Sequence, residues 1–253
     1  DNSMAETKFP TEEVNLPSQG YFYPKDNPLS SGKVEMKYMT AREEDILTSP
    51  NLLKQGTAID KLLEALIVDK KIQLDDLLIG DKNALIIAAR ILAYSKRYDF
   101  TAIDDDGEET TATVDLTTLN DKEIDFKSIP QGVNEFPFKL PNSEREVVLR
   151  ILTHKDEVEL SKEAQALQKA KLATGMTSRM KRMLVSVDGK SERVHINKFV
   201  DEELLSVDAL EIRKHLFSIT PDVNMTTIAT YADGTEREVA VQVTAQFFWP
   251  STQ

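Results

Sequence analysis

The sequence lacks cysteine and long apolar runs, and its glycines never cluster. Without a cysteine among its 253 residues, the chain can form neither disulfide bonds nor thiolate metal sites, which is typical of proteins in a reducing cytoplasm. No apolar run approaches the roughly 20 residues that span a bilayer, and nothing near the start resembles a signal peptide. The 9 glycines stand singly, so no phosphate-binding loop is present. We therefore expect no membrane contact, nucleotide or small-molecule substrate.

Positive charge is also scarce. The chain has 31 Lys and Arg against 43 Asp and Glu, a net charge of -12, which argues against nucleic acid as a partner because such binding neutralises phosphates. Basic protein partners fit this charge better. One local exception is the positive stretch Lys169, Lys171, Arg179, Lys181 and Arg182. It can be a solvated helix face or a contact with an acidic partner, where complementary charge steers association.

Groups that could support catalysis or bind metal are few. The 3 histidines, His154, His195 and His215, lie far apart in the sequence. Glu211 and His215 share a helix face at i and i+4, a spacing that fits a surface ion pair better than the edge of a metal site. We expect no metal ion, cofactor or catalytic residue, and therefore no enzyme.

The acidic segment that starts at Asp104 superficially resembles a calcium loop. Such a loop needs glycine at its sixth position and glutamate at its twelfth, whereas this segment has Glu109 and Asp115 there. The segment does not fit a calcium site.

Near the N-terminus, three consecutive aromatic residues stand between two prolines. Proline fixes its own backbone and favours extended geometry in the residue before it, so this segment cannot begin an ordinary helix or central strand. The rings can pack on the chain's own core or on a partner, since aromatics are enriched at the centres of interfaces. The residues concerned are Leu16, Pro17, Tyr21, Phe22, Tyr23 and Pro24.

Apolar spacing and capping residues predict several helices. Thr40 and Glu43 form a capping box before residues 41–47, and Ser49-Pro50 ends that helix. Apolar side chains recur at three and four residues in the other predicted helices. These helices begin near Thr57, span 81–97, begin at Thr153 and Asp156, and span 206–217.

Alternating apolar residues on both sides of turn sequences predict four β-hairpins. Their turns are Asp106-Gly107, Pro141-Asn142-Ser143, Asp188-Gly189 and Asp233-Gly234, within 98–116, 136–151, 184–196 and 228–243. The first and last share the pattern Asp-Gly-x-Glu, which we interpret as an internal structural repeat. A strand at 34–39 precedes the first helix.

Several ordered motifs of the first hundred residues are similar to those of a known family. They are Leu16-Pro17-Ser18-x-Gly20, Tyr23-Pro24, Gly32-x-Val34, Met39-Thr40-x-x-Glu43-Glu44-Asp45-Ile46-Leu47, Ala58-Ile59-Asp60-x-Leu62-Leu63 and Gly80-Asp81. This block, together with the ending Phe247-Phe248-Trp249-Pro250, resembles the T-even-type phage baseplate hub proteins. That group includes permanent hub subunits and hub assembly factors.

One departure from the family is informative. Many relatives carry a Cys-x-x-Cys zinc ribbon after the helix that matches residues 81–97, and this chain keeps the hairpin without the metal ligands. Structural zinc in finger peptides contributes on the order of 10 kcal/mol, and an isolated hairpin is marginal in water. The hairpin must therefore pack on other parts of the chain or on a partner.

These observations predict an α+β protein in three segments. An extended N-terminal arm spans 1–28, where residues 1–3 precede Met4 and are expected to derive from an expression vector. A helical unit with a metal-free, ribbon-like hairpin spans 29–125. A second half of hairpins and helices spans 126–253 and ends in a related hairpin.

The resemblance implies a non-enzymatic assembly factor for the central hub of a contractile-tail baseplate, acting in the cytoplasm of the infected host. The alternative is a permanent hub subunit in the virion. Other hub proteins are the expected partners, and hub symmetry is compatible with a homo-oligomer. Besides the arm residues, the candidate partner-binding residues are the methionine row Met176, Met180 and Met183, which can equally fill core, and the C-terminal Phe247, Phe248 and Trp249.

Overall fold

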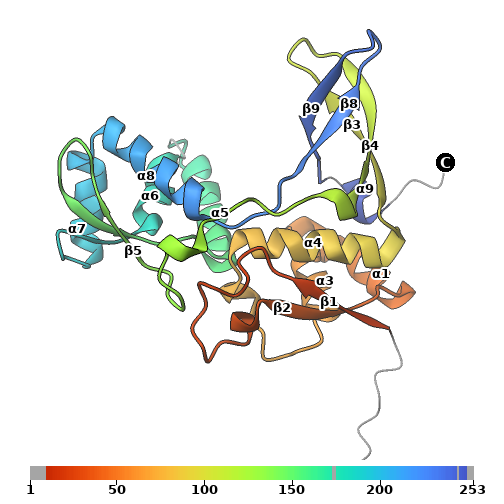
Figure 1. Ribbon diagram of the computed structural model, residues 1–253, viewed down its shortest axis with the longest axis horizontal. Coiled ribbons are helices and arrows are strands. Elements are labelled where there is room, and N and C mark those ends of the chain that lie inside the picture. Colours follow the sequence, from red (N-terminus) through yellow and green to blue (C-terminus); the bar gives the residue numbers. More distant parts are fainter. Residues whose placement is uncertain (1–9, 173–174, 244, 250–253) are drawn as a thin grey trace, which may run out of the picture.

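The chain folds around one central helix, α4 (Ile79–Tyr94). The computed structural model describes residues 10–172, 175–243 and 245–249. On one side of α4 lie the strands β1 and β2 with the helices α1 to α3, and on the other side stand two hairpins, β3–β4 and β8–β9 (Figure 1). The remaining elements form a second half beyond the N-terminal end of α4. The protein is α+β, as predicted.

The other elements of the first half have the following bounds. They are β1 (Thr11–Asn15), a 3-10 turn (Pro28–Ser31), β2 (Lys33–Lys37), α1 (Ala41–Thr48), α2 (Pro50–Gln55), α3 (Ala58–Leu66), a 3-10 turn (Leu74–Asp76), β3 (Arg97–Ile103) and β4 (Glu109–Asp115). Two further 3-10 turns, Leu116–Thr118 and Phe126–Ser128, lie on the way to the second half.

The second half and the C-terminal part complete the order. They comprise β5 (Phe136–Lys139), β6 (Glu146–Leu149), α5 (His154–Lys169), α6 (Met176–Met183), β7 (Leu184–Val187), α7 (Arg193–Lys198), a π-helical turn (Phe199–Glu203), α8 (Ser206–Ile219), β8 (Thr226–Thr230), β9 (Glu236–Ala240) and α9 (Ala245–Phe248). In the described ranges, the strands form the small sheets β1-β2, β3-β4, β5-β6-β7 and β8-β9.

Local sequence signals determine where the main helices begin. The Thr40 amide donates to the Glu43 carboxylate at 2.9 Å, which confirms the capping box of α1. Thr153 and Asp156 form the same box at the start of α5. Pro50 does more than end α1, because it occupies the first turn of α2, where its missing N–H costs no hydrogen bond.

Residues 10–32 belong to the core of the first half. Strand β1, which the sequence did not predict, pairs antiparallel with β2 and places Val14 opposite Val34. Between these strands the chain turns back sharply, and Gly20 and Gly32 both adopt positive φ. A Cβ at Gly20 would lie 2.3 Å from the Ser30 carbonyl oxygen, so the two passages of this loop touch through backbone.

A buried carboxylate holds this loop on α4. Asp81, in the first turn of α4, accepts hydrogen bonds from the Ser18 amide (3.0 Å), the Ser18 hydroxyl (2.6 Å) and the Tyr23 hydroxyl (2.6 Å). The Tyr23 oxygen in turn accepts from the Leu78 amide at 2.9 Å. Burial raises the pKa of Asp81, although its hydrogen bonds with Ser18 and Tyr23 oppose the shift. Burial, and then the Asp81 carboxylate, raise the pKa of Tyr23 well above its ordinary value.

Two connections run side by side between the halves. The first leads from β4 to β5 and the second from α8 to β8. The Lys122 amide donates to the Asp222 carbonyl oxygen and the Asn224 amide to the Asn120 carbonyl oxygen, both at 2.8 Å. The second connection also touches α4 closely, since a Cβ at Gly80 would lie 1.9 Å from the Pro221 carbonyl oxygen. The chain thus returns from the second half to the first along its outgoing path (Figure 1).

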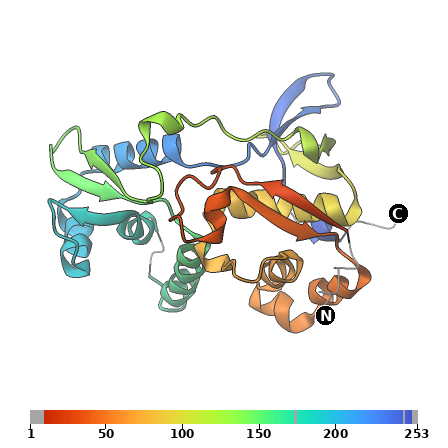
Figure 2. The same ribbon diagram turned by 60° about the horizontal axis from the view of Figure 1, so that its bottom comes forward.

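This return divides the predicted segment 126–253 in space. Residues 131–219 form the second half, whereas β8, β9 and α9 pack beside β4 and α4 of the first half (Figures 1 and 2). The Thr110 hydroxyl donates to the Thr230 carbonyl oxygen at 3.1 Å. Arg237 pairs with Asp104 at 2.6 Å and lies over the Tyr231 ring. The first hairpin therefore packs on the last one.

The two Asp-Gly hairpins have equivalent turns, as the repeat predicts. The amides of Gly107 and Gly234 donate to the carbonyl oxygens of Asp104 and Tyr231, and both glycines have φ near +80°. One detail differs from the prediction. Ile228 is exposed while Ala229 is buried, on a strand, β8, that packs beside β4 of the neighbouring hairpin.

The predicted hairpin 184–196 is wrong. The Asp188-Gly189 turn exists, with positive φ at both residues, but β7 pairs with β6 and the chain after the turn forms α7. Buried Ile196, Phe199 and Val200 follow helical spacing, and this period prevails over the short apolar alternation.

A charged cluster joins the two halves at the N-terminal end of α4. The Lys82 ammonium lies 2.8 Å from the Asp60 carboxylate and 3.1 Å from Nδ1 of His154, and Nε2 of His154 lies 3.4 Å from Asp60. The His154 amide also donates to the Leu77 carbonyl oxygen at 2.8 Å. Burial, and then Lys82, lower the pKa of His154, while Asp60, Asp75 and Glu64 act in the opposite sense.

We predict that Tyr23→Phe lowers the free energy of unfolding by about 1–3 kcal/mol, because the buried Leu78 amide and one Asp81 oxygen each lose a partner. Urea unfolding monitored by circular dichroism measures the change. Tyr38→Phe removes the same hydroxyl from a half-buried ring outside this cluster and should have a smaller effect. Equal losses in both variants would show that the Asp81 cluster contributes nothing special.

The lowered pKa of His154 predicts that stability falls in acid. Below pH of about 6.5 the unfolded chain binds a proton that folded His154 does not, so the free energy of unfolding decreases as pH falls toward the folded pKa. His154→Gln should reduce the loss measured between pH 7.5 and 5.5 by urea titration. His215, whose pKa burial also lowers, leaves a residual dependence. A full pH dependence in His154→Gln, or a reduction of the same size in exposed His195→Gln, would contradict this assignment.

Candidate interaction surfaces

Most residues predicted as aromatic anchors of the N-terminal segment lie inside the protein. Leu16, Phe22 and Tyr23 are buried, and Phe22 contacts the rings of Phe126 and Phe136. Tyr21 is half-buried and donates its hydroxyl to the Ile129 carbonyl oxygen at 2.6 Å. Pro17 is buried as well, and Pro24 is exposed. The sequence left two interpretations of this segment open, packing on the chain's own core or on a partner. The positions of these rings fit packing on the chain's own core.

The C-terminal aromatics divide between core and surface. Phe247 and Phe248 are buried, whereas Trp249 is 49% exposed. Buried Arg90 of α4 donates to the carbonyl oxygens of Phe247 (2.6 Å) and Arg97 (2.7 Å), and its guanidinium lies 5.3 Å from the centre of the Tyr98 ring. Burial lowers the pKa of Arg90. Arg90 thus fixes the last described turn of the chain on α4.

Trp249 borders an apolar groove of about 520 Å³ between the C-terminal turn and the helices α1 to α3. Exposed Leu53 and Val243 contribute apolar surface beside it. The groove is lined by Leu47, Thr48, Leu53, Ala58, Ile59, Val243, Phe248 and Trp249. We call this surface the Trp249 groove.

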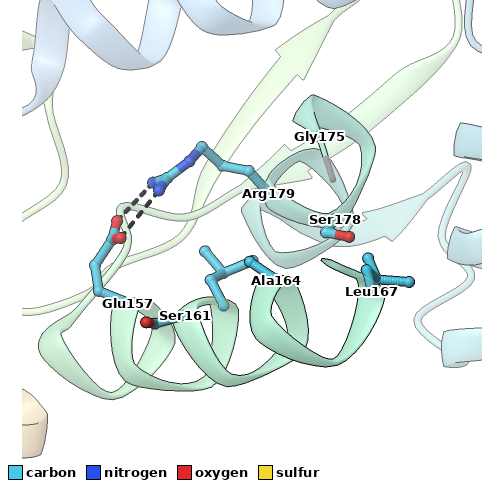
Figure 3. A pocket seen from close by; sticks show the side chains of 8 residues that line it. Glu157, Ser161, Ala164, Leu167, Gly175, Ser178 and Arg179 are labelled. Carbon is cyan, nitrogen blue, oxygen red and sulfur yellow. Dashed lines mark hydrogen bonds and ion pairs between the residues drawn. The ribbon is translucent and has the colours of Figure 1, made fainter. Parts of the chain in front are cut away.

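The methionine row does not form an exposed surface as a whole. Met180 is buried, Met183 is half-buried against the core, and Met176 is exposed. At Gly175, just before α6, a cavity of about 300 Å³ opens between α5 and α6, lined by Leu160, Ala164 and Leu167 among others (Figure 3).

The positive stretch beside these methionines is largely neutralised within the chain. Arg179 forms a bidentate pair with Glu157 at 2.5 and 2.9 Å across this cavity (Figure 3). Arg182 pairs with Glu159 at 2.5 Å, and Lys181 pairs with Asp201 at 2.9 Å. These pairs hold α6 against its neighbours. Neither a solvated helix face nor a contact with an acidic partner, the two interpretations of the stretch, included such pairing within the chain.

No metal centre occurs in the described ranges, where no three His, Cys, Asp or Glu residues converge. Glu211 pairs with Lys214 at 3.3 Å instead of with His215, whose ring stacks on Phe138 with 4.5 Å between ring centres. In the acidic turn, the Asp104 carboxylate accepts from the Asp106 and Glu108 amides and pairs with Arg237. None of the described helices has the length and apolarity needed to cross a membrane.

Sequence reasoning missed one surface. Helix α8 was predicted, but its outward side carries exposed Val207, Leu210 and Phe217. The sequence signal for this surface is that apolar residues occur on both sides of the helix. A surface helix that buries a single face carries only one apolar stripe. Together with the Trp249 groove, this gives the described chain two apolar surfaces on different halves.

Comparison with known proteins identifies the family. The family model described as T4 bacteriophage base plate protein matches residues 13–249. Curated proteins and solved structures yield no match to the chain. The matched range starts within β1 and ends at Trp249, so it includes the core, both connections and the C-terminal hairpin. The chain belongs to the T4 bacteriophage base plate protein family.

Proposed function

We propose that this baseplate protein is a non-enzymatic assembly factor that holds components of the central hub in an arrangement competent for assembly. Its partners are other hub proteins, bound through protein contacts. The length of the chain and its long second half favour this branch of the family over a permanent hub subunit.

The observation that carries the proposal is the Trp249 groove. Tryptophan is enriched among residues that dominate binding energy, and such residues pair with pockets on the partner. Trp249 is half exposed at the edge of an apolar groove, while Phe248 beside it is buried. A partner that covers the groove would bury Trp249 without rearranging the core.

A second apolar surface on α8 supports the same function. The Trp249 groove lies on the first half and α8 lies on the second, at opposite ends of the molecule in Figure 1. A protein with two such surfaces can contact two components at once.

Tagged chain should recover hub proteins from phage-infected lysate, and mass spectrometry should detect the chain in infected cells but not in purified particles. Its presence in particles would identify a permanent subunit. Failure to retain any phage structural protein would overturn the interaction role.

Within that complex, we predict that Trp249→Ala weakens partner affinity by about 2 kcal/mol or more. Because Trp249 is half exposed, its loss should change the free energy of unfolding by about 1 kcal/mol or less. Phe248→Ala should instead lower the free energy of unfolding by about 3–5 kcal/mol, as buried aromatics do. Titration of the recovered partner and urea unfolding measure the two effects.

Ile103→Ala serves as the control, since it truncates an exposed apolar side chain on β3, away from the groove. It should leave partner affinity unchanged. If Trp249→Ala binds as tightly as Ile103→Ala, the groove is not the partner site.

A further inference from the structure

Helix α8 has an apolar face on each side. Ile212, Leu216 and Ile219 are buried against the second half. On the opposite side, Val207, Leu210 and Phe217 are 51%, 42% and 72% exposed. Burying one face is sufficient to hold a surface helix on its domain, so the second face needs a different explanation.

The outward residues follow the spacing of a coiled-coil seam. Positions 207, 210, 214 and 217 are separated by three, four and three residues, as are the a and d positions of a heptad. With Val207 at a, the buried residues Asp208, Ile212 and Leu216 fall at b, f and c, away from the seam. The seam therefore points outward, in the arrangement that packs against another helix.

The seam carries positive charge. Lys214 occupies an a position between Leu210 and Phe217 and is exposed, and its ammonium lies 3.3 Å from the Glu211 carboxylate at the flanking e position. The Lys122 ammonium lies 3.6 Å from the centre of the Phe217 ring at the C-terminal end of the seam. Lys122, Arg213 and Lys214 outnumber Glu211 along this face, so a partner helix with negative charge beside Lys214 complements it.

A second copy of this chain fits this charge pattern poorly. In a parallel pair, Lys214 would face Lys214 of the other copy. In an antiparallel pair, the flanking e and g positions face their own kind, so Glu211 would oppose Glu211 and Arg213 would oppose Arg213. Like charges at these positions are unfavourable in either orientation.

We propose that the outward face of α8 binds an amphipathic helix of another protein, whose apolar seam carries a carboxylate opposite Lys214. This goes beyond the proposed function, since it assigns a surface and the chemistry of its partner. It holds for an assembly factor and for a permanent subunit alike, so it can fail while the recovery of hub proteins succeeds.

The test uses two labelled synthetic peptides of about 21 residues, or three heptads, with leucine at a and d. One has glutamate at the central a position and the other has lysine there. Fluorescence anisotropy against the full chain, at peptide concentrations where the peptides are monomeric, should show the glutamate peptide binding at least about tenfold more tightly. Lys214→Glu should reverse this preference.

Phe217→Ala should weaken binding of the glutamate peptide about tenfold or more. Ile228→Ala, which truncates an exposed apolar residue on β8, should change it less than about twofold, as expected for an exposed position outside the interface. Thermal unfolding of both variants confirms that they fold, which their exposure leads us to expect.

Equal binding of both peptides, or an unchanged preference in Lys214→Glu, would overturn the proposal. So would a dimer of the chain alone that Phe217→Ala dissociates in analytical ultracentrifugation, because the face would then serve a second copy.

Discussion

The carboxylate of Asp81 and the helical turn around it are the constraint on which the rest of the structure depends. Four consecutive residues, 80 to 83, together contact three different segments. Gly80 admits the returning connection at Pro221, Asp81 binds the N-terminal loop, Lys82 reaches His154 of the second half, and the Asn83 amide donates to Asp222. Successive side chains leave a helix about 100° apart, so one turn can contact segments on several sides. The helix N-terminus also favours the negative charge that the burial of Asp81 opposes.

Local sequence signals were sufficient to predict the elements that depend on them. Contacts between residues far apart in the sequence could not be predicted in this way. The capping boxes at Thr40 and Thr153 and the turns at Gly107 and Gly234 act within a few residues, and the structure confirms them. The pairing of β1 with β2 and the burial of Phe22 depend on residues far away in sequence, to which apolar alternation gives no clue. The hairpin predicted over 184–196 failed because a short apolar run fits a strand or a helix equally well.

The difference between local signals and non-local contacts also explains the predictions of the candidate surfaces. Aromatic residues in an irregular segment indicate strong packing, but sequence alone does not say whether the packing partner is the chain itself or another protein. Here Phe22 and Phe247 are core, whereas Trp249 and the apolar residues on the outer side of α8 are exposed. Trp249 was predicted because it belongs to the C-terminal aromatic motif. The outward face of α8 was missed because the helix was predicted from one apolar stripe, and the second stripe on its other side was not considered.

The attachment of the C-terminal segment to α4 has a consequence for folding during synthesis. The hydrogen bond from Arg90 to Phe247 spans 157 residues of sequence, and that from Tyr98 to Gln242 spans 144. During synthesis, α4 and the first hairpin leave the ribosome long before the segment that covers them. Contacts of such separation form slowly, and uncovered apolar surface invites aggregation in the interval. The nascent first half must therefore wait for the segment 225–249, and a chain that stops before it would leave one side of α4 uncovered.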